Sequence, residues 1–167
     1  MHPTRMATMF GATAAAVLLA TGPAYAGNGH FIGNATSVSS ADISSITVKF
    51  KEAGLESGSV ETIVLSASVD ATYQCINGGG HNANATNKSD EHFEPSASGS
   101  FTAAKNGNLV GSLSVSVPSV DENSLVCPKG QTEQLSVATW SNIELTDTTS
   151  GAWIALPGSY SFGELVD

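Results

Sequence analysis

A long stretch of alternating apolar and polar residues, 62–75, constrains the fold of this chain most strongly. Successive side chains of a β-strand point to opposite faces, so alternation places one set against a core and the other in solvent. The pattern predicts a half-buried strand, either continuous or broken by a bend. Its inward residues are Ile63, Leu65, Ala67, Val69, Ala71, Tyr73 and Cys75. A shorter strand with Ile46, Val48 and Phe50 on one face precedes it, and residues 53–58 supply the turn between them.

Residues 96–104 and 108–117 flank Lys105-Asn106-Gly107 and predict a β-hairpin. A three-residue loop gathers the apolar side chains on one face, whereas a two-residue Asn-Gly turn splits them between faces. The chosen loop also places each glycine opposite a large side chain. It pairs Ala103 with Leu109, Phe101 with Gly111, Gly99 with Leu113 and Ala97 with Val115.

A second hairpin is predicted around the loop 148–151. This loop pairs Leu145 with Ile154 and Ile143 with Leu156, and Leu135 and Val137 have the same parity as Ile143. The tail 159–166 is expected to form an edge strand or to fray.

About seven short strands, turns between them and no helical periodicity predict an all-β protein. We expect an antiparallel β-sandwich, immunoglobulin-like in the broad sense, with a small β-barrel as the alternative. Immunoglobulin domains carry a Trp between their two cysteines. Here Trp140 and Trp153 both follow Cys127, which argues against that specific fold.

The first 26 residues have the layout of a secretory signal peptide. Arg5 precedes an apolar run over 6–20, and Ala24-Tyr25-Ala26 is an A-x-A cleavage site. The alternative, an uncleaved anchor, is disfavoured because the apolar run is too short to span a bilayer. We expect residues 27–167 to form a single secreted, extracellular domain.

The two cysteines, Cys75 and Cys127, are expected to form one disulfide in an oxidising compartment. Free or metal-binding thiols are the alternative, although two isolated cysteines lack the spacing of a zinc site. After signal cleavage, five Lys against fifteen Asp and Glu leave a net charge of −10. Such an acidic domain repels nucleic acid and anionic membrane surfaces, so we expect neither as a partner.

The segment 77–92 is a candidate binding loop, rich in Gly and Asn. Backbone N–H groups at Gly78-Gly79-Gly80 could converge on an anion. The candidate ligand-binding residues of this loop are Gly79, Gly80, His81 and Asn82. His81, Asp90, Glu91 and His92 could approach a metal ion, but their spacing matches no known motif, so we expect neither metal nor cofactor. The alternative is a polar loop held by Cys75.

Trp140 and Trp153 are a second candidate ligand-binding pair. Strand parity points both outward, where they would form a flat aromatic platform for sugar rings or a protein. The alternative is a β-bulge near 139–142 that turns Trp140 into the core.

No catalytic residue is assigned, because no serine lies in a Gly-x-Ser-x-Gly elbow and no His has a supporting context. We expect a non-enzymatic extracellular interaction module whose partner is a protein or a glycan. The alternative is a small secreted hydrolase or a hydrolase inhibitor.

The segment Ala-Thr-Tyr-Gln-Cys-Ile-Asn-Gly-Gly-Gly-His-Asn at 71–82, with Cys-Pro at 127–128, resembles a family of small secreted actinobacterial proteins. Asn-Gly at 106–107, Gly-Gln-Thr at 130–132 and Thr-Asp-Thr-Thr at 146–149 extend the resemblance over most of the domain. The resemblance implies export and the cysteine pairing. We know of no activity for this family, so it implies no site residue.

Overall fold

A computed structural model describes residues 28–82, 87–119 and 125–166. In this part of the chain all regular structure is β, apart from one short 3₁₀ turn, η1 (Gly33–Ala35). The predicted signal peptide, 1–26, lies outside the described residues. Among the described residues, no helix has the length and hydropathy needed to cross a bilayer.

The strands form two open antiparallel sheets rather than a closed barrel. The first, sheet A, has β3 at its centre, with β7 along one edge and β1 and β2 in succession along the other. Its strands are β1 (His30–Phe31), β2 (Ser37–Ala41), β3 (Ser45–Ala53) and β7 (Leu109–Ser116).

The second, sheet B, is built around the antiparallel pair β4 and β8. Strands β6 and β5 follow one another along the free edge of β4, and β9 and β10 do the same along β8. Its strands are β4 (Val60–Asn77), β5 (Lys88–Phe93), β6 (Ser96–Thr102), β8 (Gln131–Asp147), β9 (Trp153–Leu156) and β10 (Tyr160–Gly163). The predicted edge strand at the tail is β10.

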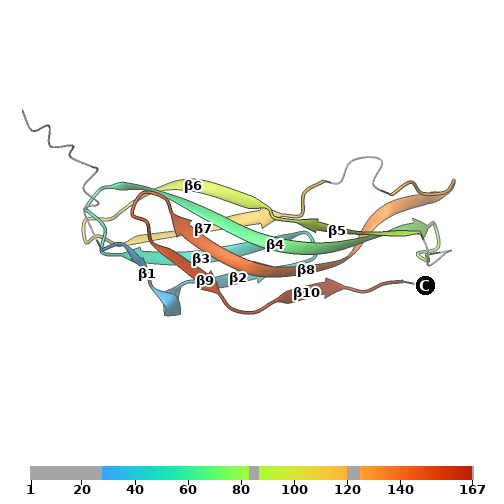
Figure 1. The fold of residues 1–167 in the computed structure, drawn as a ribbon, viewed down its shortest axis with the longest axis horizontal. Coiled ribbons are helices and arrows are strands. Elements are labelled where there is room, and N and C mark those ends of the chain that lie inside the picture. The colour runs from blue at the N-terminus through green and yellow to red at the C-terminus, as the bar shows by residue number, and fades with distance from the viewer. Residues whose placement is uncertain (1–27, 83–86, 120–124, 167) are drawn as a thin grey trace, which may run out of the picture.

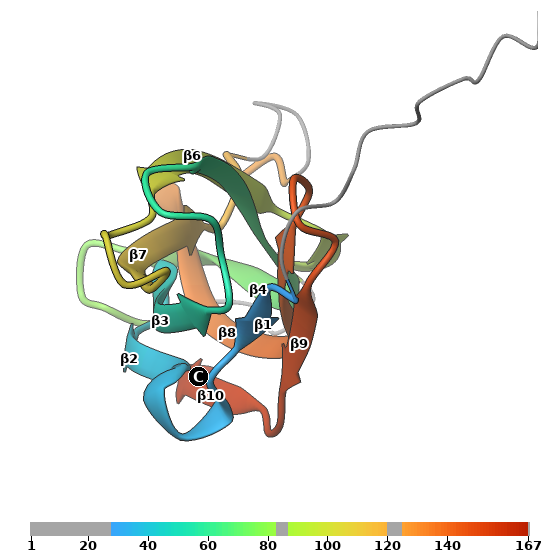
Figure 2. The same ribbon diagram turned by 90° about the vertical axis from the view of Figure 1, so that its left-hand side faces the viewer.

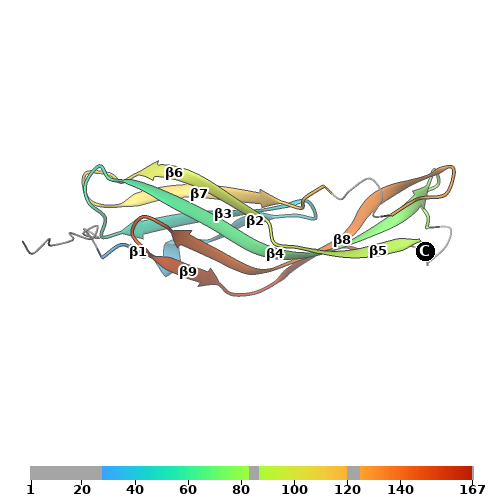
Figure 3. The same cartoon turned by 45° about the horizontal axis from the view of Figure 1, so that its top comes forward.

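The molecule is elongated because sheet A covers only part of sheet B (Figures 1 and 3). Strands β4, β5 and β8 run on beyond the sandwich as a twisted ribbon, at the right of Figure 1. Figure 2 views the opposite end, where β1 lies between β3 and β9.

The alternation predicted for residues 62–75 is confirmed in β4, which is continuous. Its seven inward residues are at most 7% exposed. On β3, Ile46, Val48 and Phe50 are likewise buried and face β4 residues across the sandwich core. The predicted turn between the two strands is also present, with Gly54 and Gly58 at positive φ.

The predicted hairpin of 96–104 with 108–117 is wrong, since β6 pairs with β4 while β7 pairs with β3 in the other sheet. The turn at Gly107 (φ +71°) therefore carries the chain from one layer to the other. The expected side-chain neighbours do meet, but across the core. A Cβ on Gly111 would lie 2.6 Å from Phe101 Cε1, and one on Gly99 would lie 3.2 Å from Leu113 Cδ2. Alternation identifies a buried face, but it does not distinguish a pairing strand from a facing one.

The predicted pairs Leu145–Ile154 and Ile143–Leu156 are confirmed between β8 and β9. Farther along β8, however, the register to β4 shifts twice, between Ser66 and Ser68 and between Thr72 and Tyr73. At each shift β8 contains one extra residue, and a β-bulge of this kind exchanges the two faces of a strand. Val137 therefore does not share a face with Ile143, contrary to the expectation.

The Cys75–Cys127 disulfide is confirmed, and it spans 52 positions of the chain. Cys75 is in the part of β4 that belongs to the ribbon, opposite Glu133 of β8. The bridge therefore ties the segment before β8 to the ribbon and does not join the two layers of the sandwich, as an immunoglobulin disulfide would.

The contact of Gly111 with two phenyl rings yields a stability test. A methyl group at Gly111 would lie 2.7 Å from Phe50 Cζ as well as against Phe101. Because overpacking a tight core is destabilising, we expect Gly111→Ala to lower the free energy of unfolding by about 1–3 kcal/mol. Chemical denaturation measures the loss. Gly33→Ala, whose added Cβ would meet nothing within 4 Å, is the matched control, and equal effects of the two substitutions would contradict the packing.

Candidate functional site

The structure places the two tryptophans in opposite environments. Trp140 is completely buried, and its Nε1 donates a hydrogen bond of 2.9 Å to the carbonyl oxygen of Asp42. The bulge near 139–142 causes this placement, because Asn142 adopts φ +48° and reverses the faces of β8. The expectation of two outward tryptophans on one platform is therefore wrong for Trp140, and the bulge alternative holds.

Trp153 does point outward, and it is 67% exposed. It lies on β9 directly opposite Thr146, while Glu144 of β8 is opposite Ala155. Trp153 and Glu144 are thus diagonal neighbours on the outer face of sheet B, where such side chains stand about 7–8 Å apart.

Small hydroxyl side chains share the rest of this outer face with Val60 and Val64 of β4. Strand β4 carries outward residues that pair row by row with outward residues of β6. Exposed and half-buried positions alternate along β6, and each exposed, outward position is occupied by Ser or Thr. The hydroxyl residues on this face are Thr62, Ser66, Ser96, Ser98, Ser100, Thr102 and Thr146.

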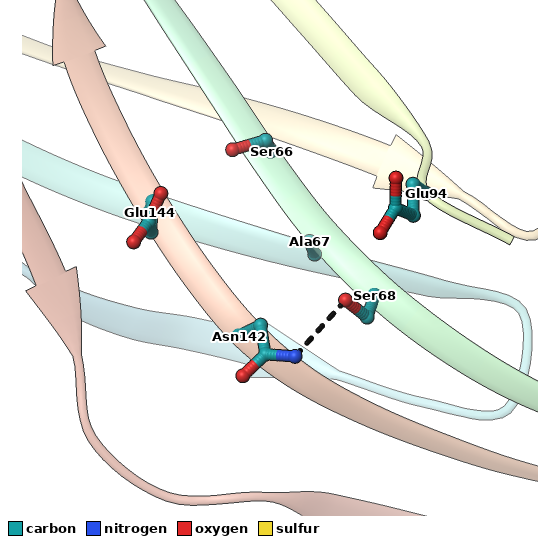
Figure 4. A pocket seen from close by; sticks show the side chains of 6 residues that line it. All are labelled: Ser66, Ala67, Ser68, Glu94, Asn142 and Glu144. Carbon is teal, nitrogen blue, oxygen red and sulfur yellow. Dashed lines mark hydrogen bonds between the residues drawn. The ribbon is translucent and has the colours of Figure 1, made fainter.

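A polar depression of about 380 Å³ opens on the same face at the β8 bulge (Figure 4). Asn142 donates a hydrogen bond of 3.2 Å from Nδ2 to Ser68 Oγ across its floor. Glu144 lies on one side of β4 and Glu94 on the other (Figure 4). The lining residues are Ser66, Ala67, Ser68, Glu94, Asn142 and Glu144.

The sequence analysis did not identify this depression. The sequence did indicate one lining residue of the depression, because Glu144 lies between the inward residues Ile143 and Leu145 and therefore points outward. Asn142 faces the depression only because of the bulge, and no periodic pattern indicates a bulge.

The depression does not have the arrangement of an acid–base active site. Glu94 has a side chain that is 80% exposed, and Glu144 is exposed as well. Hydrolysis by two carboxyl groups requires that they flank one bond in different environments, usually with one of them desolvated. Here both face solvent on an open surface.

Only part of the expected long loop 77–92 lies in strands, because β4 ends at Asn77 and β5 begins at Lys88, and residues 83–86 lie outside the described residues. Asp90, Glu91 and His92 thus lie in a strand. His92 Nδ1 is 2.7 Å from Asp70 Oδ1, and both side chains are exposed. Among the described residues, no group of three or more His, Cys, Asp or Glu side chains has an arrangement that could hold a metal ion.

In the turn that follows β4, backbone N–H groups donate hydrogen bonds to Asn77. The backbone N–H groups of Gly79 and His81 donate to Asn77 Oδ1, at 2.8 and 3.2 Å, and that of Gly80 donates to the Asn77 carbonyl. These groups already have acceptors, so they do not form an anion site. Gly79, Gly80 and His81 are exposed, whereas Asn82 is buried.

The opposite placement of the two tryptophans predicts opposite effects on stability. Trp140→Phe removes a buried hydrogen bond and core volume, so we expect the free energy of unfolding to fall by about 2–4 kcal/mol. Trp153→Phe should change it by less than about 0.5 kcal/mol. Denaturation titrations measure both values. Acrylamide should quench the fluorescence of the Trp140→Phe protein and spare that of the Trp153→Phe protein; the reverse would contradict the bulge.

Comparison with protein-family models, with curated proteins and with solved structures finds no match for this chain. The resemblance to small secreted actinobacterial proteins therefore remains an expectation from the motif around Cys75.

Proposed function

We propose that the protein is a secreted, non-catalytic module that binds extracellular polysaccharide through the outer face of sheet B. The observation that carries this proposal is the exposed Trp153 on an open, hydroxyl-bearing sheet face beside a polar depression. Export is inferred from the signal-peptide pattern at 1–26 and is consistent with the disulfide.

The chemistry of this face suits a sugar chain. An indole ring stacks on the apolar face of a pyranose ring without needing a deep pocket. The carboxylate of Glu144 and the amide of Asn142 can accept and donate hydrogen bonds to sugar hydroxyls, and bonds to the charged carboxylate are the stronger. Because stacking and polar groups are adjacent on one surface, they can act on the same or on neighbouring sugar units.

Charge restricts the ligand class. The chain carries a net charge of −9, and the depression holds two carboxylates and no cationic side chain. Polyanions such as nucleic acid or heavily sulfated glycans would be repelled, so a neutral or amino-sugar polymer fits best.

The ribbon supports a second candidate, the hydrolase inhibitor. It projects beyond the sandwich, the disulfide braces it, and it exposes Gly79, Gly80 and His81 at a turn ordered by Asn77. A braced projecting turn can insert into the cleft of a partner enzyme with little loss of conformational entropy. If His81→Ala, rather than Trp153→Ala, abolished binding to a partner enzyme, the result would favour this alternative.

The polysaccharide proposal is tested by sedimentation of the processed protein with insoluble cellulose, chitin and cell-wall sacculi. We expect the wild type to sediment with at least one of them and Trp153→Ala to lose about tenfold or more in affinity, equivalent to about 1.4 kcal/mol. Val110→Ala, at a residue 73% exposed on sheet A, is the control and should bind as the wild type does. A wild type that stays in the supernatant throughout, or a Trp153→Ala protein that binds equally well, would contradict the proposal.

A further inference from the structure

Three acidic side chains are buried together at the end of the sandwich where β1 lies. Glu52 comes from β3, Glu61 from β4 and Asp147 from the end of β8. Their exposures are 0%, 4% and 0%, and they are the charged residues buried in the part of the chain that the structure describes. Carboxylates are seldom buried so completely without a cationic partner.

One oxygen of each carboxyl group has a donor. Ser150 Oγ donates to Glu52 Oε1 at 2.9 Å, Ser59 Oγ donates to Glu61 Oε1, and the Thr149 N–H donates to Asp147 Oδ1 at 2.8 Å. The second oxygens are different. Glu52 Oε2, Glu61 Oε2 and Asp147 Oδ2 are buried and have no hydrogen-bond donor. The Asp147 carboxyl lies within hydrogen-bonding reach of both glutamates.

In the described part of the chain, no cationic side chain compensates the three charges. The charged groups that act on Glu52 are Asp147 and Glu61, both acidic. On the surrounding strands β1, β6, β7 and β9, the one titratable side chain is His30, which is exposed and bonded to the Asn28 carbonyl. In the adjoining turns, Glu56 and Lys105 are exposed. Lys51 on β3 has the opposite strand parity to Glu52.

Bound protons can supply the hydrogen-bond donors that the cluster lacks and can neutralise its charge. A protonated carboxyl group is a hydrogen-bond donor, so a proton on one member can satisfy a second oxygen of its neighbour and remove a buried charge. Burial, together with the charges of Asp147 and Glu61, raises the pKa of Glu52 to about 7. Burial likewise raises the pKa of Glu61.

We propose that Glu52, Glu61 and Asp147 form a proton-holding cluster that keeps this end of the sandwich closed at acidic pH and loosens it as the protons are lost. The segments that would loosen are those packed on the cluster. A Cβ on Gly29 would lie 2.8 Å from both Glu52 Oε1 and Ser150 Oγ, so residues 28–31 and the turn 148–152 close over the carboxyl groups.

The direction of the pH dependence follows from linkage. A group that holds its proton more tightly in the folded state stabilises the fold at low pH. For Glu52 this stabilisation is complete below its ordinary pKa of 4.5 and is lost as the pH rises to about 7. Between a pH well below 4.5 and a pH well above 7, the unfolding equilibrium constant should rise about 300-fold.

Variants that remove the charge test the cluster. Asp147→Asn keeps an oxygen that can accept from the Thr149 N–H, while its amide supplies the missing donor. We expect its unfolding constant to change by a several-fold smaller factor between pH 4.5 and 8 than that of the wild type, which changes about 150-fold. Removing the Asp147 charge lowers the pKa of Glu52, although burial still raises it. Glu144→Gln, on the exposed face of the same strand, is the matched control and should retain the wild-type dependence. An unaltered pH dependence in Asp147→Asn would overturn the proposal.

Two measurements on the wild type keep the proposal testable if Asp147→Asn fails to fold. Carboxyl ¹³C NMR at pH 6 should show at least one of the three groups protonated, and finding all three ionised would overturn the proposal. Hydrogen exchange of residues 28–31 and 148–152, corrected for the intrinsic rate, should increase from pH 5 to pH 8 relative to central β3. Calcium or magnesium that abolishes this increase at pH 8 would also overturn the proposal, because a cation would then compensate the charge.

Discussion

The pairing of β4 with β8 is the interaction on which the rest of the structure depends. These two long strands remain opposed from Ile63–Asp147 to Asn77–Gln131. All other strands of sheet B attach to their free edges, and sheet A packs on one half of the pair. Because β4 and β8 extend beyond the part of sheet B that sheet A covers, the same two strands contribute to the sandwich core and form the centre of the ribbon (Figure 1).

The bulge within this pair links the fold to the candidate site. One extra residue in β8 turns Trp140 inward, where it fills the core and bonds to Asp42, and it turns Asn142 outward into the depression. Trp153 on the neighbouring β9 is unaffected and stays in solvent. A single local irregularity thus stabilises the interior and creates the polar part of the proposed binding face.

Two-residue periodicity in the sequence was sufficient to predict β3, β4, the β8–β9 hairpin and the all-β class. It could not predict that β6 and β7 face each other instead of pairing, since both arrangements bring Phe101 to Gly111. Periodicity also could not indicate the bulges in β8, so the prediction placed Trp140 on the outer face although the bulge turns it into the core. The sequence analysis did not identify the carboxyl cluster. Parity indicated part of it, since Glu52 shares the face of Phe50 on β3 and Glu61 shares the face of Ile63 on β4.

Solution NMR of the β4–β8 register tests the central claim most directly. Interstrand contacts between opposed backbone protons should place Leu65 opposite Leu145 and Ala71 opposite Ala138, an offset that changes by one residue across the bulge. A constant register would instead place Ala71 opposite Thr139. That result would turn Trp140 to the surface, and it would contradict both the core and the binding face described for this protein.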